Sequence, residues 1–302
     1  MKILVLSRRR SLYSTRRFVE TARRMGHRPM VVDPLNCFLV CGASNPSVYH
    51  KNSHKRLDDV DVVLPRIGAS ITEYGLAVVN HFEALGVPVV NGAQAIAQSR
   101  DKLRSLQILA QHRIDIPKTV MARTPAQIER ALQEVGGPPV VLKLVQGTQG
   151  IGVMLAETQS ALEAILDTLW GLGQNILIQE FIPESRGRDI RAMVVGGKVI
   201  AAMRRIARVG EFRSNIHRGG EGRVLLLPAE YERVAVESAR VTGLTLAGVD
   251  MLESRVGPKV IEINSSPGFE GLEAATRLDI ARLILNFAVE YSAHRRQSRA
   301  RA

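Results

Sequence analysis

The sequence has little cysteine and no long apolar run. Its two cysteines, Cys37 and Cys41, have no further Cys or His cluster at metal-ligand spacing nearby, which excludes a disulfide scaffold and a structural zinc site. No run approaches the roughly 18 apolar residues of a membrane helix, and the opening MKILVLSRRRS has too short an apolar stretch for a signal peptide. We therefore expect a cytoplasmic protein that has no membrane partner.

Acidic residues are in the minority. The 302 residues include 41 Lys and Arg against 29 Asp and Glu, so the formal net charge is 41 − 29 = +12. Such a surplus predicts an anionic partner, and nucleic acid, nucleotide phosphates and an acidic peptide all fit. Apolar residues make up 45% of the chain, which is enough for the core of two domains or one large one.

The first hundred residues contain no repeat and no low-complexity segment. Apolar runs over 2–6, 29–32, 61–64 and 87–90 alternate with helical patterns, which predicts a small parallel sheet with helices on both faces. The turn after the first run, SRRRSLYST, lacks the G-x-G-x-x-G pattern, which argues against a dinucleotide site there.

The pattern changes after Ser99. A helix over 101–112 is followed by two β-rich runs, 140–145 and 153–156, which a glycine-rich turn joins as a hairpin. Strands dominate from Ile190 onward, and no helix directly follows the glycines, so a Walker loop is excluded. The second part of the chain is therefore predicted to be an α+β body of antiparallel pieces.

Three oxygen-bearing residues form the strongest constellation. Glu262 and Asn264 are two apart on a predicted strand and share one face, while Ile261 and Ile263 are expected to fill the other. If Asp250 lies opposite Glu262, the hairpin turn falls near Val256, beside Gly257-Pro258. Two carboxylates and an amide suit a hard cation that also binds substrate phosphates, although an exposed polar strand face is the simpler alternative.

Lys143 lies within the otherwise apolar run PVVLKLVQ. A buried ammonium either reaches the surface or meets an anion, and a phosphate is the obvious anion. The glycines that follow let backbone amides approach phosphate oxygens, although glycines of a tight turn more often serve turn geometry. These glycines are Gly147, Gly150 and Gly152.

Several weaker candidates stand beside ordinary structural alternatives. Glu180 and Phe181 end a strand next to Pro183, where an adenine could bind or an edge strand could simply be solvated. Lys102 begins a helix, as a phosphate ligand or as a solvated residue. The arginine-rich stretch that includes Arg205 and Arg213 suits a phosphoryl-transfer site or a solvated face, and its single aromatic, Phe212, argues against RNA stacking.

In their order along the chain, these motifs resemble the ATP-grasp superfamily of carboxylate–amine ligases and, within it, the RimK family. The resemblance rests on RDKLRS, KLVQGTQGIGV, QEFI, FRSNIHRGG, AGVDML and EINSSPGFEG, and it runs from the first strand to about Asp279. It implies the ATP-grasp fold, of α/β and α+β type, with a Rossmann-like pre-ATP-grasp domain at the N-terminus. The segments implied are residues 1–97, 98–180 and 181–302.

The resemblance also implies roles for individual residues. Gln146 departs from the family pattern, which expects Glu there, and Pro183 and Arg188 make the segment after Phe181 less typical. Arg205 and Arg213 would be catalytic, facing the transferred group. The implied metal ligands are Asp250, Glu262 and Asn264. The implied ATP contacts are Lys102, Lys143, Gly147, Gly150, Gly152, Glu180, Phe181, Asp189, Arg213, Ser214 and Asn215.

The implied reaction uses ATP and two Mg²⁺ or Mn²⁺ ions to add L-glutamate to the C-terminal glutamate of a protein or peptide, as on ribosomal protein S-six, through an acyl phosphate. Implied partners are L-glutamate, an acidic C-terminal peptide of a ribosomal protein, the ribosome and further copies of the chain as a tetramer. Two alternatives stay open: a ligase for a small-molecule carboxylate, and an inactive basic protein that binds RNA or the ribosome.

Arginines near the two ends of the chain lie outside the assigned site, so part of the surplus charge is unexplained, and a glutamate-rich product or the RNA of the ribosome would each suit them as a partner. They are Arg8, Arg9, Arg10, Arg295, Arg296, Arg299 and Arg301.

Overall fold

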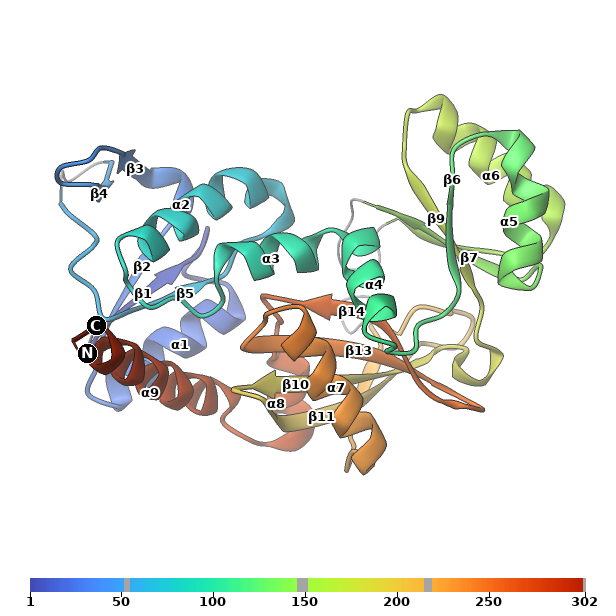
Figure 1. Cartoon of the computed structure of the whole chain (residues 1–302). Coiled ribbons are helices and arrows are strands. Elements are labelled where there is room, and N and C mark those ends of the chain that lie inside the picture. Colours follow the sequence, from blue (N-terminus) through green and yellow to red (C-terminus); the bar gives the residue numbers. More distant parts are fainter. Residues whose placement is uncertain (52–54, 146–151, 215–218, 301–302) are drawn as a thin grey trace.

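The computed structural model describes residues 1–51, 55–145, 152–214 and 219–300, with side chains through residue 297. Figure 1 shows an N-terminal lobe in blue and teal, a green lobe and a central body in yellow to red. Each is built on a sheet, of three, four and five strands respectively. None of the helices in the described ranges is long and apolar enough to cross a membrane.

The N-terminal lobe has a parallel sheet in the order β2-β1-β5. Because side chains alternate along a strand, Ile3 and Val5 pack with α1 while Leu4 and Leu6 pack with α2. The predicted parallel sheet with helices on both faces is therefore confirmed. The elements of this lobe are β1 (Lys2–Leu6), α1 (Tyr13–Arg24), β2 (Arg28–Val32), β5 (Val62–Pro65), α2 (Thr72–Ala84) and α3 (Ala93–Arg100).

One predicted strand of this lobe does not form. The run over 87–90 makes a single parallel bridge, between Val63 and Val89. Pro65 and Pro88 lack the N–H groups that the next bonds of this ladder would need, so the pairing stops on both sides.

The sequence pattern also missed a short hairpin, in which β3 (Cys37–Val40) pairs antiparallel with β4 (Ser47–His50). Its strands carry a cross-strand aromatic pair, Phe38 and Tyr49, with ring centroids 6.4 Å apart. At four residues each, these strands are too short for an alternating apolar pattern to reveal them.

The green lobe is an antiparallel sheet in the order β6-β9-β7-β8, covered by two helices (Figure 1). The predicted hairpin of β7 and β8 is confirmed, with Lys143 opposite Val153. The elements are β6 (Thr119–Ala122), α5 (Ile128–Val135), β7 (Val140–Leu144), β8 (Val153–Ala156), α6 (Gln159–Gly171) and β9 (Ile176–Glu180).

The central body is an antiparallel sheet in the order β12-β11-β10-β13-β14. One face packs against α4 and α7, and the other packs against Phe269, Leu272 and the helix that follows them. The predicted α+β body is confirmed. The elements are α4 (Lys102–Gln111), β10 (Arg188–Val195), β11 (Lys198–Ile206), β12 (Glu221–Val224), α7 (Ala229–Val241), β13 (Leu246–Ser254), β14 (Gly257–Asn264), α8 (Glu270–Thr276) and α9 (Ile280–Ala300).

The last helix, α9, returns to the N-terminal lobe and lies beside it (Figure 1). Ile284 and Leu285 share one core cluster with Ile3 and Val5. Ser292 Oγ donates to the carbonyl of Asp61 at 2.7 Å, and Arg296 forms an ion pair with the Asp61 side chain. The division at residues 97 and 180 stays a prediction, and α9 belongs spatially with the first segment.

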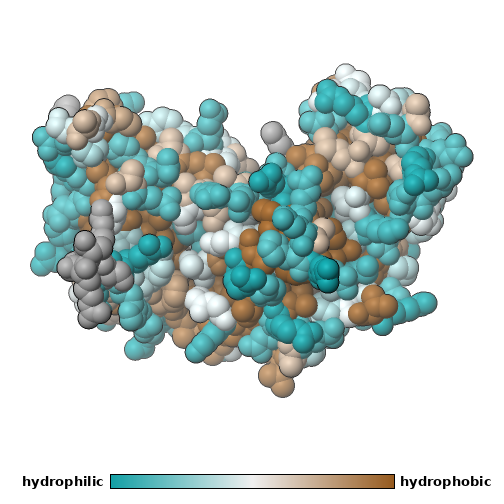
Figure 2. All heavy atoms as spheres, viewed as in Figure 1, coloured by the Kyte–Doolittle hydropathy of each residue, from teal (hydrophilic) through white to brown (hydrophobic). Residues whose placement is uncertain are grey.

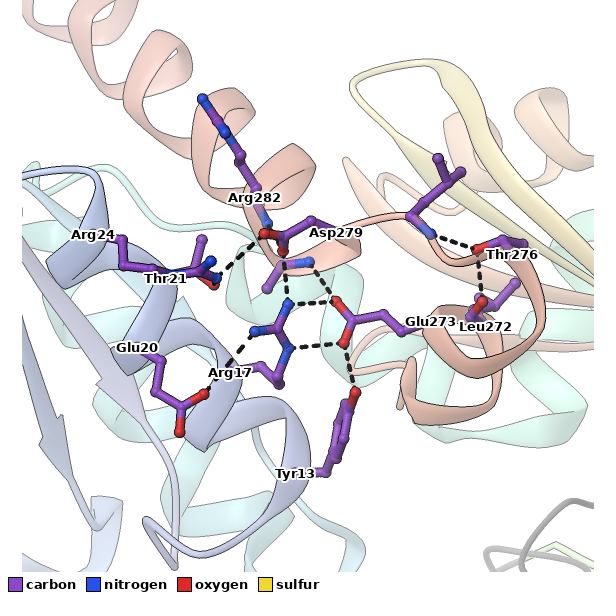
Figure 3. A network of polar contacts seen from close by, with 12 residues as sticks. Tyr13, Arg17, Glu20, Thr21, Arg24, Leu272, Glu273, Thr276, Asp279 and Arg282 are labelled. Atoms are coloured by element: carbon purple, nitrogen blue, oxygen red, sulfur yellow. Dashed lines mark hydrogen bonds and ion pairs between the residues drawn. The ribbon is translucent and has the colours of Figure 1, made fainter.

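A polar network joins α1 to α8 and to the segment between α8 and α9 (Figure 3). Glu273 accepts from Tyr13 Oη at 2.6 Å and from Arg17 Nε at 2.8 Å, and Arg17 also pairs with Asp279 at 2.8 Å. Burial, assisted by the bond to Glu273, raises the pKa of Tyr13 to about 12. The network therefore holds the N-terminal lobe at a fixed place beside the central body.

Candidate active site

The predicted carboxylates lie on neighbouring strands of the central sheet. The register of β10, β13 and β14 sets Arg191, Asp250 and Glu262 in one row. Asp250 thus lies directly opposite Glu262 across a hairpin whose turn, Arg255–Val256, falls where the sequence predicts it. The predicted hairpin is confirmed.

The face assigned to Ile261 was wrong. The register of β13 and β14 shifts between Asp250 and Met251, which leaves Ile261 as the extra residue of a β-bulge. A bulge breaks the strict alternation of faces, so Ile261 lines the same cavity as Glu262 while Ile263 is buried in the core.

Asn264 and Glu262 lie side by side. With the Asn264 amide oriented to satisfy both of its groups, its nitrogen donates to Glu262 Oε1 at 3.3 Å and its oxygen accepts from Arg191 at 3.2 Å. No ion pair joins Glu262 to any residue in the described part of the chain. Its carboxylate therefore retains oxygen lone pairs for a hard cation, the kind of ligand that magnesium prefers.

Asp250 is fully buried and already neutralised. Its carboxylate accepts from Arg191 Nε at 2.7 Å and Nη2 at 2.6 Å, and it pairs with Arg205 at 2.9 Å. Arg205 in turn pairs with Asp189 at 2.6 Å, and Ser214 Oγ donates to Asp189 at 2.6 Å. These contacts make one buried network across β10, β11 and β13.

The network keeps Asp250 and Arg205 charged. Burial alone would raise the pKa of Asp250, but Arg191 and Arg205 lower it below its ordinary value. Burial likewise opposes the charge of Arg205, but Asp189 and Asp250 raise the pKa of its guanidinium above the ordinary value. The carboxylate oxygens of Asp250 already accept hydrogen bonds from two guanidinium groups. Asp250 is therefore less available as a metal ligand than Glu262 is.

Two lysines face Glu262 from different lobes. Burial lowers the pKa of Lys143 to about 8, an effect that the carboxylate of Glu262 opposes. Burial also lowers the pKa of Lys102, again against Glu262, and its Nζ lies 3.5 Å from the carbonyl of Val145. No described carboxylate forms an ion pair with Lys143. An anion that entered between the two lysines would relieve this cost of burial.

A cavity of about 130 Å³, the inner cavity, lies between the four-stranded and five-stranded sheets. Figure 2 shows the surface hollowed between the N-terminal lobe and the green lobe. The inner cavity brings together most of the sequence-predicted residues with the apolar side chains Val141, Leu252 and Ile261. The predicted residues that line it are Lys102, Lys143, Glu180, Phe181, Asp189, Arg205, Arg213, Ser214, Asp250 and Glu262.

Some predicted residues lie elsewhere. Gly147, Gly150 and Asn215 lie outside the described residues. Gly152 has φ +74°, and a Cβ there would come within 2.6 Å of the Leu144 side chain, so this position requires glycine whether or not a phosphate binds.

The predicted nucleotide residues at the cavity rim have protein partners. Arg213 pairs with Glu211 at 2.7 Å and lies 5.5 Å from the Phe212 ring centre. Glu180 accepts from the backbone N–H of Lys118 at 3.0 Å and forms an ion pair with Lys259 at 3.6 Å.

A second space of about 1130 Å³, the wide cavity, lies between the N-terminal lobe and the central body. Lys102, Arg205 and Glu262 line both cavities, so the two adjoin at these residues. Asn264 lines the wide cavity, together with three arginines that sequence reasoning missed: Arg66, Arg100 and Arg191. For Arg191 a signal existed, because it lies two residues after Asp189 on one strand and so shares its face.

Family models match nearly the whole chain. A RimK PreATP-grasp domain matches residues 1–96, and a RimK-like ATP-grasp domain matches residues 99–288. The chain belongs to the RimK-like ATP-grasp family. The predicted family, fold and enzyme class are thereby confirmed, and the protein is an ATP-dependent ligase.

The chain is also similar to bacterial proteins over its full length. It is 50% identical over 303 residues to the "Probable alpha-L-glutamate ligase" of Thioalkalivibrio sulfidiphilus, covering 100% of both chains. It is 52% identical over 285 residues to the protein of the same description from a Marinomonas species, covering 94% of each.

Solved structures share the fold. The ATP-grasp ligase PsnB complexed with its minimal precursor superposes with a TM-score of 0.76 at 22% identity, over 96% of this chain and 98% of PsnB. A RimK domain ATP-grasp protein from Sphaerobacter thermophilus gives a TM-score of 0.72 at 25% identity, over 96% and 100%. PsnB has also been solved with Mg and ADP.

Proposed function

We propose that this ligase adds L-glutamate to the C-terminal glutamate of a protein or peptide. The observation that carries the proposal is the junction of the two cavities: a pocket with two lysines opens, at Lys102, Arg205 and Glu262, into a wide basic cavity. The lysines of the first suit the phosphates of ATP, and the arginines of the second suit an acidic peptide and a free amino acid. The alpha-L-glutamate ligases at about 50% identity support the choice of amino acid.

The reaction proceeds in two steps. A carboxylate oxygen of the acceptor attacks the γ-phosphorus of ATP, the bond to the β-phosphate oxygen breaks, and ADP leaves an acyl phosphate. The deprotonated amine of L-glutamate then attacks the acyl carbon, and phosphate leaves from the tetrahedral adduct as the amide bond forms. The side chains of this chain supply orientation and charge, and no protein nucleophile is required.

Charged residues at the junction would act on the phosphates. Lys102 and Lys143 hold the triphosphate, and Arg205 and Arg213 face the transferred group. Arg205 is held rigidly by Asp189 and Asp250, so its remaining donor capacity is preorganised. Glu180, Phe181, Asp189 and Ser214 would contact the nucleotide base and ribose, and Gly152 would contact the phosphates. Gly147, Gly150 and Asn215 lie outside the described residues and stay proposed ATP contacts by family resemblance alone.

Two Mg²⁺ or Mn²⁺ ions belong to the proposal. Glu262 and Asn264 would hold an ion, with Asp250 as the third ligand beside its arginines. A bound ion supplies neutralisation of phosphate charge. Without it, Glu262 would repel the triphosphate, so the residues of this chain fit a cation best where Glu262 and Asn264 meet.

The test is ADP release by the whole chain with ATP, magnesium and L-glutamate. We expect release to rise with a peptide that ends in glutamates, and mass spectrometry of the peptide to show added glutamate residues. A peptide ending in alanines serves as the matched control. Release only with a small-molecule carboxylate would favour the first alternative, and no release with any acceptor would favour the inactive basic protein. Ribosome association and a tetramer are further proposals, checked by sedimentation with ribosomes and by mass in solution.

A further inference from the structure

The N-terminal wall of the wide cavity carries two arginines without a carboxylate partner. Arg66 follows β5, and Arg100 ends α3. Arg66 Nη2 donates to the carbonyl of Pro267 at 2.7 Å and to Ser14 Oγ at 3.2 Å, and Arg100 donates to the carbonyl of Ile67. Within the described ranges neither arginine forms an ion pair, and the hydrogen-bond acceptors just named are all neutral oxygens.

Three polar atoms on the two sides of the wide cavity, two from the N-terminal lobe and one from the central body, are buried without any hydrogen-bond partner among the described residues. They are Arg66 Nη1, Arg100 Nε and Ser265 Oγ. All three residues line the wide cavity. Burial lowers the pKa of Arg66 to about 10, and the charge of Arg100 lowers it further. Buried donors without partners are costly, so a cluster of them at a cavity wall indicates that an incoming group completes their bonds.

The position of these three residues indicates which part of a substrate would bind to them. Arg100 precedes Lys102 by two residues, and Lys102 marks the junction with the inner cavity. The triphosphate belongs on the inner side of that junction, so the group on the outer side comes from the amino acid or from the acceptor. Both carry carboxylates, and a planar guanidinium matches a carboxylate with paired, charge-assisted bonds.

We propose that Arg66, Arg100 and Ser265 form a subsite that binds a carboxylate of the amino-acid or peptide substrate beside the junction. This deepens the proposed function and rests on it. The two guanidinium groups would donate hydrogen bonds to the carboxylate oxygens, and the Ser265 hydroxyl would donate to one of these oxygens. The subsite would orient the substrate, while the transferred phosphate stays with the residues of the inner cavity.

The experiment measures binding without turnover. L-glutamate and a peptide ending in two glutamates are titrated calorimetrically, in separate arms, into the whole chain with ADP and magnesium. We expect Arg66→Lys, Arg100→Lys and Ser265→Ala each to weaken one of the two probes about tenfold or more, with ADP affinity changed less than about threefold. The probe whose affinity falls in the variants identifies which substrate supplies the carboxylate. Wild-type affinity in both arms, or absence of binding to the wild type, would overturn the subsite.

Two variants separate binding from structure. Arg8 also lines the wide cavity but pairs with Asp33 at 3.2 Å. The Arg8→Lys variant should therefore bind both probes with affinities within about twofold of wild type. Ser265→Ala removes a hydroxyl that has no partner, so its melting temperature should not fall while its probe affinity does. A fall in melting temperature with unchanged affinity would show a purely structural role for Ser265 and overturn its place in the subsite.

The outcomes for the two proposals can be told apart. If wild type releases no ADP with any acceptor but still binds a probe that the variants lose, the proposed function falls and the subsite stands. If wild type is an active ligase and all three variants bind both probes as wild type does, the subsite alone falls.

Discussion

The charged groups around the two cavities differ in whether they have partners. Arg191, Arg205, Asp189 and Asp250 form a closed network in which each charge meets an opposite one within 3 Å. Lys143, Glu262, Arg66 and Arg100 lie nearby, and none of them forms an ion pair with a described residue. Paired charges fix the geometry of the site, whereas unpaired ones mark the places where anions and cations of the reaction are expected to enter.

The largest effect should come from breaking the paired group. Asp250→Asn leaves Arg191 and Arg205 without half of their counter-charge in a buried place. We expect the free energy of unfolding, from denaturant titration, to fall by about 3 to 5 kcal/mol. A fall of under about 1 kcal/mol would contradict the view that the network organises the central sheet.

Glu262→Gln tests the unpaired carboxylate. The change removes a charge that has no ion-pair partner, so we expect the melting temperature to stay near that of wild type. Turnover, measured as ADP release, should drop about 100-fold or more, because the cation would lose the carboxylate ligand that has no ion-pair partner among the described residues. Glu253→Gln is the matched control, since Glu253 lies on β13, pairs with Arg204 and lines neither cavity. Equal activity of the two variants would remove Glu262 from the metal site.

The pKa of Lys143 predicts a pH dependence. Because that pKa is lowered to about 8, the ammonium loses its proton as the pH rises through about 8, and attraction for the triphosphate declines above that pH. We expect the KM for ATP to rise about tenfold between pH 7 and pH 9. In Lys143→Arg the charge persists, so the profile should be flat over that range. Identical profiles for the two proteins would show that Lys143 does not titrate in this way.

The smallest effect sharpens the contrast between buried and exposed pairs. Glu237 and Arg240 form an ion pair of 2.6 Å on α7, where their side chains are 39% and 66% exposed. Glu237→Gln should change the free energy of unfolding by less than about 1 kcal/mol, because solvent already screens this pair. A loss as large as that of Asp250→Asn would mean that burial does not explain the difference.

Much of the site could be predicted because side chains alternate along a strand, so the sequence shows which residues share a face. Alternation predicted that Glu262 and Asn264 share a face, and the Gly257-Pro258 signal predicted a turn near Val256 that sets Asp250 opposite Glu262. The face of Ile261 was mispredicted because a bulge depends on the partner strand, which the local pattern does not show. The strand over 87–90 was mispredicted because its ladder needed N–H groups that prolines lack, one of them on another strand.

The terminal arginines show the same division. Composition alone left Arg8 and Arg296 without a role, and the fold gives them carboxylate partners, Asp33 and Asp61. These two arginines are therefore neutralised within the fold and add nothing to the +12 surplus, whereas the arginines without ion pairs around the cavities belong to it.

The order of elements, the family motifs and the residue types that suit ATP and a cation can be read from the chain, because they depend on local pattern and spacing. Which charges are neutralised and which have no ion-pair partner depends on how distant segments pack together. Arg66 belongs to the N-terminal lobe and Ser265 to the central body, and nothing in their local sequence indicates that they line the same cavity. Their shared wall exists because α9 and the Glu273 network hold the N-terminal lobe against the central sheet, and contacts between distant segments are set by packing of the whole chain.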